Sequence, residues 1–270
     1  MTLIVSWIGV DQRGASSMYM MSDSRISWKN ANKYEYWDNS KKVFAFKNSP
    51  DIISYSGDVL FTTQVISHIV NIADSGVLFK DVSLPDKKFE RIKYKIFELF
   101  ESYPEKYLSE SFTLLYGTRI DTYEFACYEL SWNKAIKWKD SKISQFKKSD
   151  VLFILGSGGE EFKTRYADYQ KSEIQGTSRA VYQCFCDTLI NIKDQRCGGA
   201  PQLVGLYRIR NGIDFGILYS KKRYLSGIQI DNLGNFERIE WRNELFERYD
   251  GNKKKILPNA QKQPKPKGLT

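Results

Sequence analysis

The order of hydrophobic patterns along the chain is the feature that most constrains its fold. Short apolar runs typical of strands come first, and two longer stretches with helical spacing follow them. The same succession then repeats, and a last set of strand-like runs follows. The strand-like runs cover residues 3–8, 17–22, 43–46, 52–56, 112–117, 124–130, 135–138, 151–155, 203–208, 213–219 and 236–241, and the helical stretches cover residues 58–73, 86–102, 160–169 and 177–192.

This order predicts an α+β fold in which helices pack on two sheets. A doubly wound parallel sheet would instead alternate single strands and helices throughout. A dinucleotide-binding version of that fold would also carry a glycine-rich loop after an early strand, and the sequence has none.

The composition indicates a soluble globular protein. Hydrophobic residues make up 41% and aromatic residues 14% of the 270 residues, which excludes a disordered chain. No run approaches the roughly 20 apolar residues of a membrane-spanning helix. Trp7 is soon followed by Asp11 and Arg13, which is unlike a secretory signal. We therefore expect a cytoplasmic protein with one domain over residues 1–250.

The last twenty residues, 251–270, differ in composition from the rest. They contain six lysines and no acid, which leaves about +3 of the formal net charge of +9 for the remaining chain. Prolines and the lack of a periodic apolar pattern predict a disordered basic tail, which would solubilise the protein or dock on an acidic partner. Nucleic-acid binding is disfavoured because aromatic residues do not alternate with the lysines.

Cysteine and histidine usage does not support a metal site, a disulfide framework or a cofactor. Cys184 and Cys186 lie on a helical stretch without nearby histidines, and Cys127 and Cys197 are far apart. The single histidine, His68, lies in an apolar helical run and is expected to be a packed side chain. A Ser-His or Cys-His catalytic pair therefore has only one candidate base, in an unpromising position.

A different nucleophile is available at the start of the chain. Thr2 follows Met1 directly and opens the first strand-like run. Removal of Met1 would leave a hydroxyl and a free α-amine on one residue, and such an amine titrates at about 7.7–8.0. Thr2 would then carry both a nucleophile and its base.

Polar residues at the ends of the first strands are candidates to orient this pair. Asp23 and Arg25 follow the second strand, and the simplest interpretation is a local ion pair. Lys42 enters the strand 43–46. Gly57 ends a strand at a helix start, where its amide could face a developing oxyanion.

Two further turns have the same small-residue character. Ser157 lies in a Gly-Ser-Gly segment between a strand and a helix, and Asp194 and Cys197 lie in the Asp-Gln-Arg-Cys-Gly-Gly segment after the longest helical stretch of the second block. Each turn alone is common.

In this order and spacing, these residues together resemble the proteasome β-subunit family of N-terminal nucleophile hydrolases, over roughly residues 2–220. The resemblance implies a four-layer αββα sandwich, with two antiparallel sheets between helical layers. It also implies a catalytic set of Thr2, Asp23, Lys42, Gly57, Ser157, Asp194 and Cys197, with Arg25 in a structural ion pair.

The mechanism that the resemblance implies is acyl transfer to the Thr2 hydroxyl, with the α-amine as base. The Lys42 ammonium, held by Asp23, lowers the pKa of the attacking group, and the Gly57 amide binds the tetrahedral oxygen. Ser157 and Asp194 orient the amine. Cys197 departs from the family, which usually has serine there, and a thiol is the weaker hydrogen-bond donor.

The family's first substrate subsite maps to largely apolar positions, which predicts cleavage of a peptide or unfolded protein after hydrophobic residues. Ser27 would bind the substrate backbone through main-chain groups. The expected subsite residues are Ile26, Ser40, Phe44, Tyr55, Val59 and Thr63. The resemblance further implies a homo-oligomeric ring and an ATP-dependent unfoldase as partner, without a cofactor.

Three other functions remain open from the sequence. A proteasome-like scaffold that keeps Met1 would be catalytically silent. A small-molecule amidase would use the same fold and nucleophile on another substrate, because fold does not fix substrate. A nucleic-acid-binding module would depend on the lysine-rich tail.

Overall fold

The first apolar run forms an inner strand of the larger of two main sheets. The computed structural model describes residues 2–31, 33–82, 84–109, 111–230 and 235–269. Strand β1 (Ile4–Asp11) lies between β10 (Asp150–Leu155) and β2 (Gly14–Ser22) and is antiparallel to both. The ten-stranded sheet continues through β11 (Gln202–Tyr207), β12 (Ile213–Tyr219), β13 (Lys222–Leu225), β14 (Ile228–Gln229), β15 (Trp241–Asn243), β16 (Arg248–Asp250) and β17 (Lys255–Ile256).

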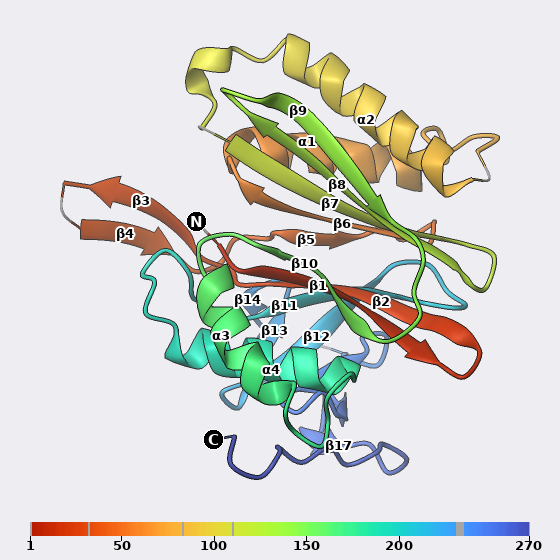
Figure 1. Cartoon of the computed structure of the whole chain (residues 1–270), viewed down its shortest axis with the longest axis vertical. Coiled ribbons are helices and arrows are strands. Elements are labelled where there is room, and N and C mark those ends of the chain that lie inside the picture. Colours follow the sequence, from red (N-terminus) through yellow and green to blue (C-terminus); the bar gives the residue numbers. More distant parts are fainter. Residues whose placement is uncertain (1, 32, 83, 110, 231–234, 270) are drawn as a thin grey trace.

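The second main sheet has five strands in sequence order, and all neighbours in it are antiparallel. A separate two-stranded hairpin projects from the body of the molecule (Figure 1). The five-stranded sheet consists of β5 (Val43–Ala45), β6 (Asp51–Gly57), β7 (Ser111–Ile120), β8 (Glu124–Asn133) and β9 (Lys137–Ile143), and the hairpin consists of β3 (Ile26–Asn30) and β4 (Lys33–Trp37).

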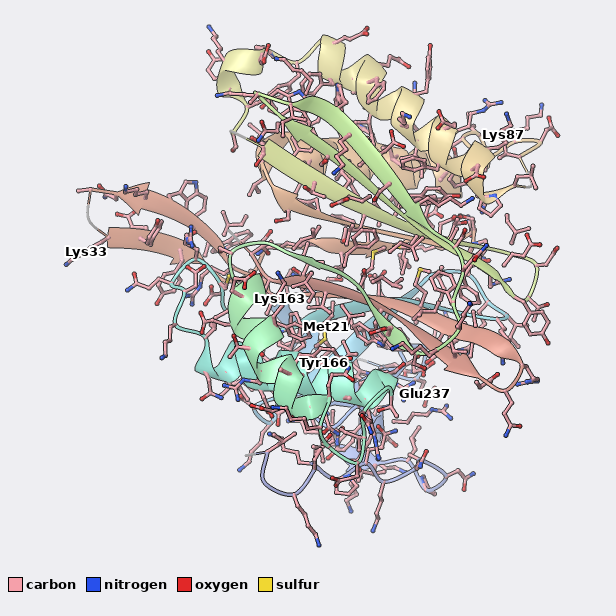
Figure 2. All side chains as sticks on the ribbon, in the orientation of Figure 1. Met21, Lys33, Lys87, Lys163, Tyr166 and Glu237 are labelled. Atoms are coloured by element: carbon pink, nitrogen blue, oxygen red, sulfur yellow. The ribbon has the colours of Figure 1, made fainter. Side chains whose placement is uncertain are left out.

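Each main sheet packs against a pair of helices. The helices α1 (Leu60–Asp74) and α2 (Pro85–Glu101) share an apolar cluster with the five-stranded sheet, and the 3-10 turn η1 (Glu105–Tyr107) follows them. The helices α3 (Gly159–Tyr169) and α4 (Ser178–Asn191) share another cluster with the ten-stranded sheet. Figure 2 labels Met21 of β2 and Tyr166 of α3, which both belong to this second cluster.

All four helical stretches predicted from the sequence are therefore helices. Local chemistry explains two of their starts. Pro85 is the first residue of α2, where a missing amide hydrogen has no cost, and the Thr177 side chain caps α4 by accepting from the Ala180 amide. None of the helices in the described ranges combines the length and apolar character needed to span a bilayer.

A third apolar cluster joins the two main sheets. Alternate residues of β1 face opposite sides, so that Val5 and Trp7 belong to the α3–α4 cluster while Ile4 and Ile8 belong to the cluster between the sheets. A strand buried on both faces reads as a continuous apolar run, which is the pattern that opens the sequence.

The ten-stranded sheet corrects the expectation of two purely antiparallel sheets. Strand β12 pairs with β15 in parallel, with Gly216 opposite Trp241. The predicted strand over residues 236–241 is also wrong, because a turn closed by the Ile239 amide and the Phe236 carbonyl oxygen occupies most of it. Only the last residue of that run enters a strand.

The C-terminal segment also differs from the expectation of disorder. Strand β17 pairs with β16, and Leu269 packs against the α3–α4 cluster. Lys265 Nζ lies 2.5 Å from Asp187 Oδ1 on α4. The Gln263 carbonyl oxygen accepts a hydrogen bond from the Gln183 side chain. Contacts with a helix about 80 residues earlier fix this segment, and a reading of local composition cannot detect them.

Candidate active site

Thr2, Asp23 and Lys42 meet where β1 and β2 of the ten-stranded sheet come close to β5 of the five-stranded sheet. Thr2 lies just before β1, Asp23 directly follows β2, and Lys42 directly precedes β5. Lys42 Nζ donates to Thr2 Oγ1 at 2.7 Å and to Asp23 Oδ1 at 2.8 Å, and Thr2 Oγ1 donates to the same carboxylate oxygen at 2.5 Å. The hydroxyl is thus in direct contact with a proton acceptor and an ammonium group.

Backbone amides fix the orientation of the Asp23 carboxylate. The Leu3 amide donates to Oδ1 at 3.1 Å, while the amides of Gly198 and Arg25 donate to Oδ2 at 3.0 and 3.3 Å. Side chain and main chain together supply donors to both oxygens. The carboxylate therefore cannot rotate without breaking several hydrogen bonds.

The side chains of Thr2, Asp23 and Lys42 are buried. Thr2 is 1% exposed, Asp23 0% and Lys42 2%. A buried ion pair is tolerated only when its remaining hydrogen-bonding positions are satisfied, as they are for this carboxylate. Low polarity strengthens the interaction of the ammonium with any negative charge on the Thr2 oxygen. The arrangement is suited to stabilising an alkoxide-like nucleophile.

Gln202 is a site residue that the sequence did not indicate. Its Nε2 donates to the carbonyl oxygens of Asp23 at 3.0 Å and Ser40 at 2.7 Å, and its Oε1 accepts from the Lys42 amide at 3.1 Å. One buried side chain therefore ties together the backbones that carry the carboxylate and the ammonium. A glutamine at a strand start gives no local signal of such a role.

Arg25 forms an ion pair, but its partner is not Asp23. Its Nε and a terminal nitrogen contact the two Asp38 carboxylate oxygens at 2.7 and 3.0 Å, and its guanidinium lies 3.8 Å from the ring centre of Tyr36. The hydrogen bonds to Asp38 raise the pKa of Arg25. The local ion pair suggested by the spacing of Asp23 and Arg25 is therefore replaced by one between Arg25 and Asp38.

Ser157, Cys197 and Asp194 form a second polar cluster. Ser157 Oγ lies 3.6 Å from Cys197 Sγ, and Sγ lies 3.8 Å from Asp194 Oδ2. Partial burial alone would raise the pKa of Asp194, but hydrogen bonds from Arg196 and Ser157 outweigh it and lower this pKa to about 2. Burial raises the pKa of Cys197 to about 12, so its thiol is neutral.

Two glycines connect this cluster to Thr2. The Gly158 amide donates to the Thr2 carbonyl oxygen at 3.2 Å. At Gly156, with φ +86°, an added Cβ would lie 2.1 Å from that oxygen, so a side chain cannot fit there. The turn after β10 therefore packs directly against the Thr2 backbone, with no room for a side chain between them.

Gly57 is required by its own surroundings. It ends β6 with φ +103°, and an added Cβ would lie 2.3 Å from the Ser111 carbonyl oxygen. This close approach of β7 explains a glycine at this position without any catalytic role. Its role as an oxyanion donor therefore stays a prediction.

Solved structures with a similar fold now set this geometry in context. An Anbu (ancestral beta-subunit) from Yersinia bercovieri matches with a TM-score of 0.54 and 12% identity, covering 79% of this chain and 87% of that one. Anbu from Pseudomonas aeruginosa, described as a helical assembly, matches with a TM-score of 0.52 and 10% identity, covering 86% and 88%. The chain has the proteasome-like fold of Anbu. No protein-family model and no curated protein matches the sequence.

In this Anbu-like fold, several of the predicted subsite residues lie in or near β5 and β6. Ser40 and Tyr55 are buried, with their hydroxyl oxygens 3.5 Å apart, and the Tyr55 ring lies in the core beneath α1 and α2. The role of Tyr55 in a substrate subsite therefore stays a prediction. Phe44 packs at the edge of the same core, and Val59 directly precedes α1.

The remaining predicted positions are less closely grouped. Thr63 is in the first turn of α1, where its hydroxyl donates to the Val59 carbonyl oxygen at 2.6 Å. Ile26 and Ser27 open β3, which begins the projecting hairpin; Ser27 is buried and Ile26 is half-buried. Their roles in substrate binding stay predictions.

Proposed function

We propose that this chain is a threonine peptidase that uses Thr2 as an N-terminal nucleophile after removal of Met1. The observation that carries the proposal is the contact of Thr2 Oγ1 with both Lys42 Nζ and Asp23 Oδ1. A fully buried lysine ammonium is costly unless an opposite charge and hydrogen bonds compensate it. Here its ammonium points at a hydroxyl on the second residue of an Anbu-like fold.

In the proposed reaction, the Thr2 hydroxyl attacks a peptide carbonyl and its own α-amine, directly or through water, takes the proton. Lys42 stabilises the negative charge that develops on Oγ1, and Asp23 keeps the ammonium in place. The protonated α-amine passes this proton to the nitrogen of the leaving peptide, the C–N bond breaks, and water then attacks the acyl-enzyme. The same α-amine acts as the base in this second step.

Other predicted residues have supporting roles in this proposal. The Gly57 amide binds the tetrahedral oxygen, and loss of such a contact typically costs about 10²–10³ in rate. Ser157 and Asp194 orient the freed amine. The hydrogen bond from the Gly158 amide to the Thr2 carbonyl oxygen supports this role, since it holds the turn that carries Ser157 against Thr2. Cys197 contributes a weak hydrogen bond to the same cluster.

The proposal also covers the layering of the fold and the assembly of the chain. Three apolar clusters, two between helices and sheets and one between the sheets, support a four-layer αββα arrangement (Figure 1). We further propose a homo-oligomer, an ATP-dependent unfoldase as partner and a cytoplasmic location. The helical assembly described for Pseudomonas aeruginosa Anbu makes an open helix the alternative to a closed ring.

The proposed substrate is a peptide or unfolded protein cut after an apolar residue. The apolar positions Phe44 and Val59 near the site strands support this preference. A small-molecule amidase and a catalytically silent scaffold are the alternatives that the experiment must separate.

The test combines intact mass with peptidase assays of the purified chain. We expect the mass of a protein that lacks Met1, hydrolysis of fluorogenic peptides with an apolar residue before the cleaved bond, and a covalent epoxyketone adduct at Thr2. Thr2→Ala should abolish both the hydrolysis and the adduct, whereas Thr2→Ser should retain them. Thr164→Ala, on the exposed face of α3, is the matched control and should behave as wild type.

Each alternative predicts a different result. A scaffold retains Met1 and hydrolyses nothing. An amidase loses Met1 and hydrolyses free acyl-amides, but not peptides. Peptidase activity that survives in Thr2→Ala would show that another residue is the nucleophile.

A further inference from the structure

A cavity of about 690 Å³ lies beside the C-terminal strands, and its lining includes none of the candidate active-site residues. Its walls come from the start of β12, from the segment around β15 and from β16 with the loop that follows it. Glu237, labelled in Figure 2, is one of its lining residues. Pockets of about 300–1,000 Å³ are of the size that holds a small-molecule ligand.

Four acidic residues line the cavity, and two of them are paired with cations. Asp214 Oδ1 lies 3.4 Å from Lys41 Nζ, and Glu240 Oε2 lies 3.3 Å from an Arg210 nitrogen. Asp250 Oδ1 accepts two backbone amides in its own turn, each at 2.9 Å. Glu237 accepts a hydrogen bond from the Asn235 side chain at 3.3 Å, so among the described residues a cation pairs with Asp214 and Glu240 but not with Glu237 or Asp250.

The basic lining residues are in the opposite situation. Lys47, Arg238, Arg248 and Lys253 are exposed, and their side chains form no ion pair or hydrogen bond with another residue of the described ranges. Two are guanidinium groups, whose planar donors fit the oxygens of a phosphate, and two are compact ammonium charges. These four cations outnumber Glu237 and Asp250, the two lining acids that have no ion-pair partner among the described residues.

A buried donor lies behind the wall of the cavity. Trp241 is 2% exposed, and its Nε1 has no hydrogen-bond partner within the described residues. It lies against Gly251, where an added Cβ would be 2.2 Å from Nε1. Both residues line the cavity. Gly251 therefore covers this N–H, and a ligand in the cavity would reach it only if the loop after β16 shifted.

We propose that this cavity binds a phosphorylated small molecule, such as a nucleoside phosphate or an inorganic polyphosphate. The unpaired cations would hold the phosphate oxygens, and the apolar side chains between them would contact the rest of the ligand. The site is independent of the proposed peptidase activity. Its test needs only binding by the full chain.

The experiment is calorimetric titration of the purified chain with ATP, AMP, pyrophosphate and orthophosphate, against sodium chloride at equal ionic strength. We expect saturable binding of at least one phosphate compound, with about tenfold weaker affinity in Lys253→Gln and in Arg248→Gln. Lys147→Gln removes an exposed charge outside the cavity and should leave the affinity unchanged. Far-UV circular dichroism verifies the fold of each variant.

The ligands separate the two sources of phosphate. Binding of pyrophosphate as tight as that of ATP indicates an inorganic polyphosphate site, and binding of ATP and AMP alone indicates that the nucleoside is recognised. The proposal is overturned if no phosphate compound binds beyond the salt control. It is also overturned if Lys147→Gln weakens binding as much as Lys253→Gln.

Discussion

Replacement of Asp23 by asparagine should destabilise the protein more than almost any other isosteric change. The substitution keeps the shape of the side chain but leaves the Lys42 ammonium, 2% exposed, without its counter-charge. Removing one partner of a buried pair typically costs about 3–5 kcal/mol. Whole domains are stable by only about 5–15 kcal/mol, so a large part of the stability is at risk.

The assay is urea denaturation followed by tryptophan fluorescence, with the free energy of unfolding extrapolated to water. Lys42→Met removes the other partner. The double variant Asp23→Asn/Lys42→Met should lose less stability than the sum of the single variants, by about 0.5–3 kcal/mol, because neither charge is then left alone. Glu160→Gln breaks an exposed pair with Lys163 as a control and should change stability by less than about 0.5 kcal/mol.

The reasoning is refuted if Asp23→Asn costs less than about 1 kcal/mol, or if the two single losses add up to that of the double variant. Either result would mean that the Lys42 side chain finds another partner when the Asp23 carboxylate is removed. The proposed electrostatic support of the Thr2 hydroxyl would then lose its basis.

Three further predictions concern groups around the same site. Gln202→Leu should lower peptidase activity by at least tenfold and the free energy of unfolding by about 1–3 kcal/mol, because it leaves two carbonyl oxygens and one amide without their partner. Steady-state kinetics measure the first effect and urea denaturation measures the second. Native protein should resist iodoacetamide at pH 8 at Cys197, whose pKa is raised to about 12 by burial; mass spectrometry would contradict this by finding rapid alkylation. Asp194, with its pKa lowered to about 2, should stabilise the fold above pH 4 and lose that contribution as the pH falls toward 2. Carbon NMR titration should show that the pKa of Asp194 rises in Arg196→Gln, which lacks the arginine that donates hydrogen bonds to it.

The sequence predicted those parts of the molecule that depend on local patterns. The four helices were identified because their apolar residues repeat with helical spacing over ten residues or more. The Asp23–Lys42 pair was predicted only through a family resemblance, since the two residues are separated by 18 others and share no local motif.

Long-range contacts account for what the sequence did not reveal. Gln202 is 162 and 179 residues from the two carbonyl groups that it binds. The basic C-terminal segment is held by Asp187 and Gln183 of α4, so its polar composition says little about its order. Strand β15 has only three residues, too few for a periodic pattern, and its parallel pairing depends on β12.

The polar site also has a role in specifying the fold. Strand β1 is apolar on both faces, so a shift of its register by one residue would still bury hydrophobic side chains. Polar contacts remove this ambiguity: Asp23 accepts the Leu3 amide, the Gly158 amide binds the Thr2 carbonyl oxygen, and Ser6 Oγ accepts the Phe153 amide. The residues that surround the proposed nucleophile therefore also fix the strand that carries it, so disruption of Asp23 should impair folding and activity together.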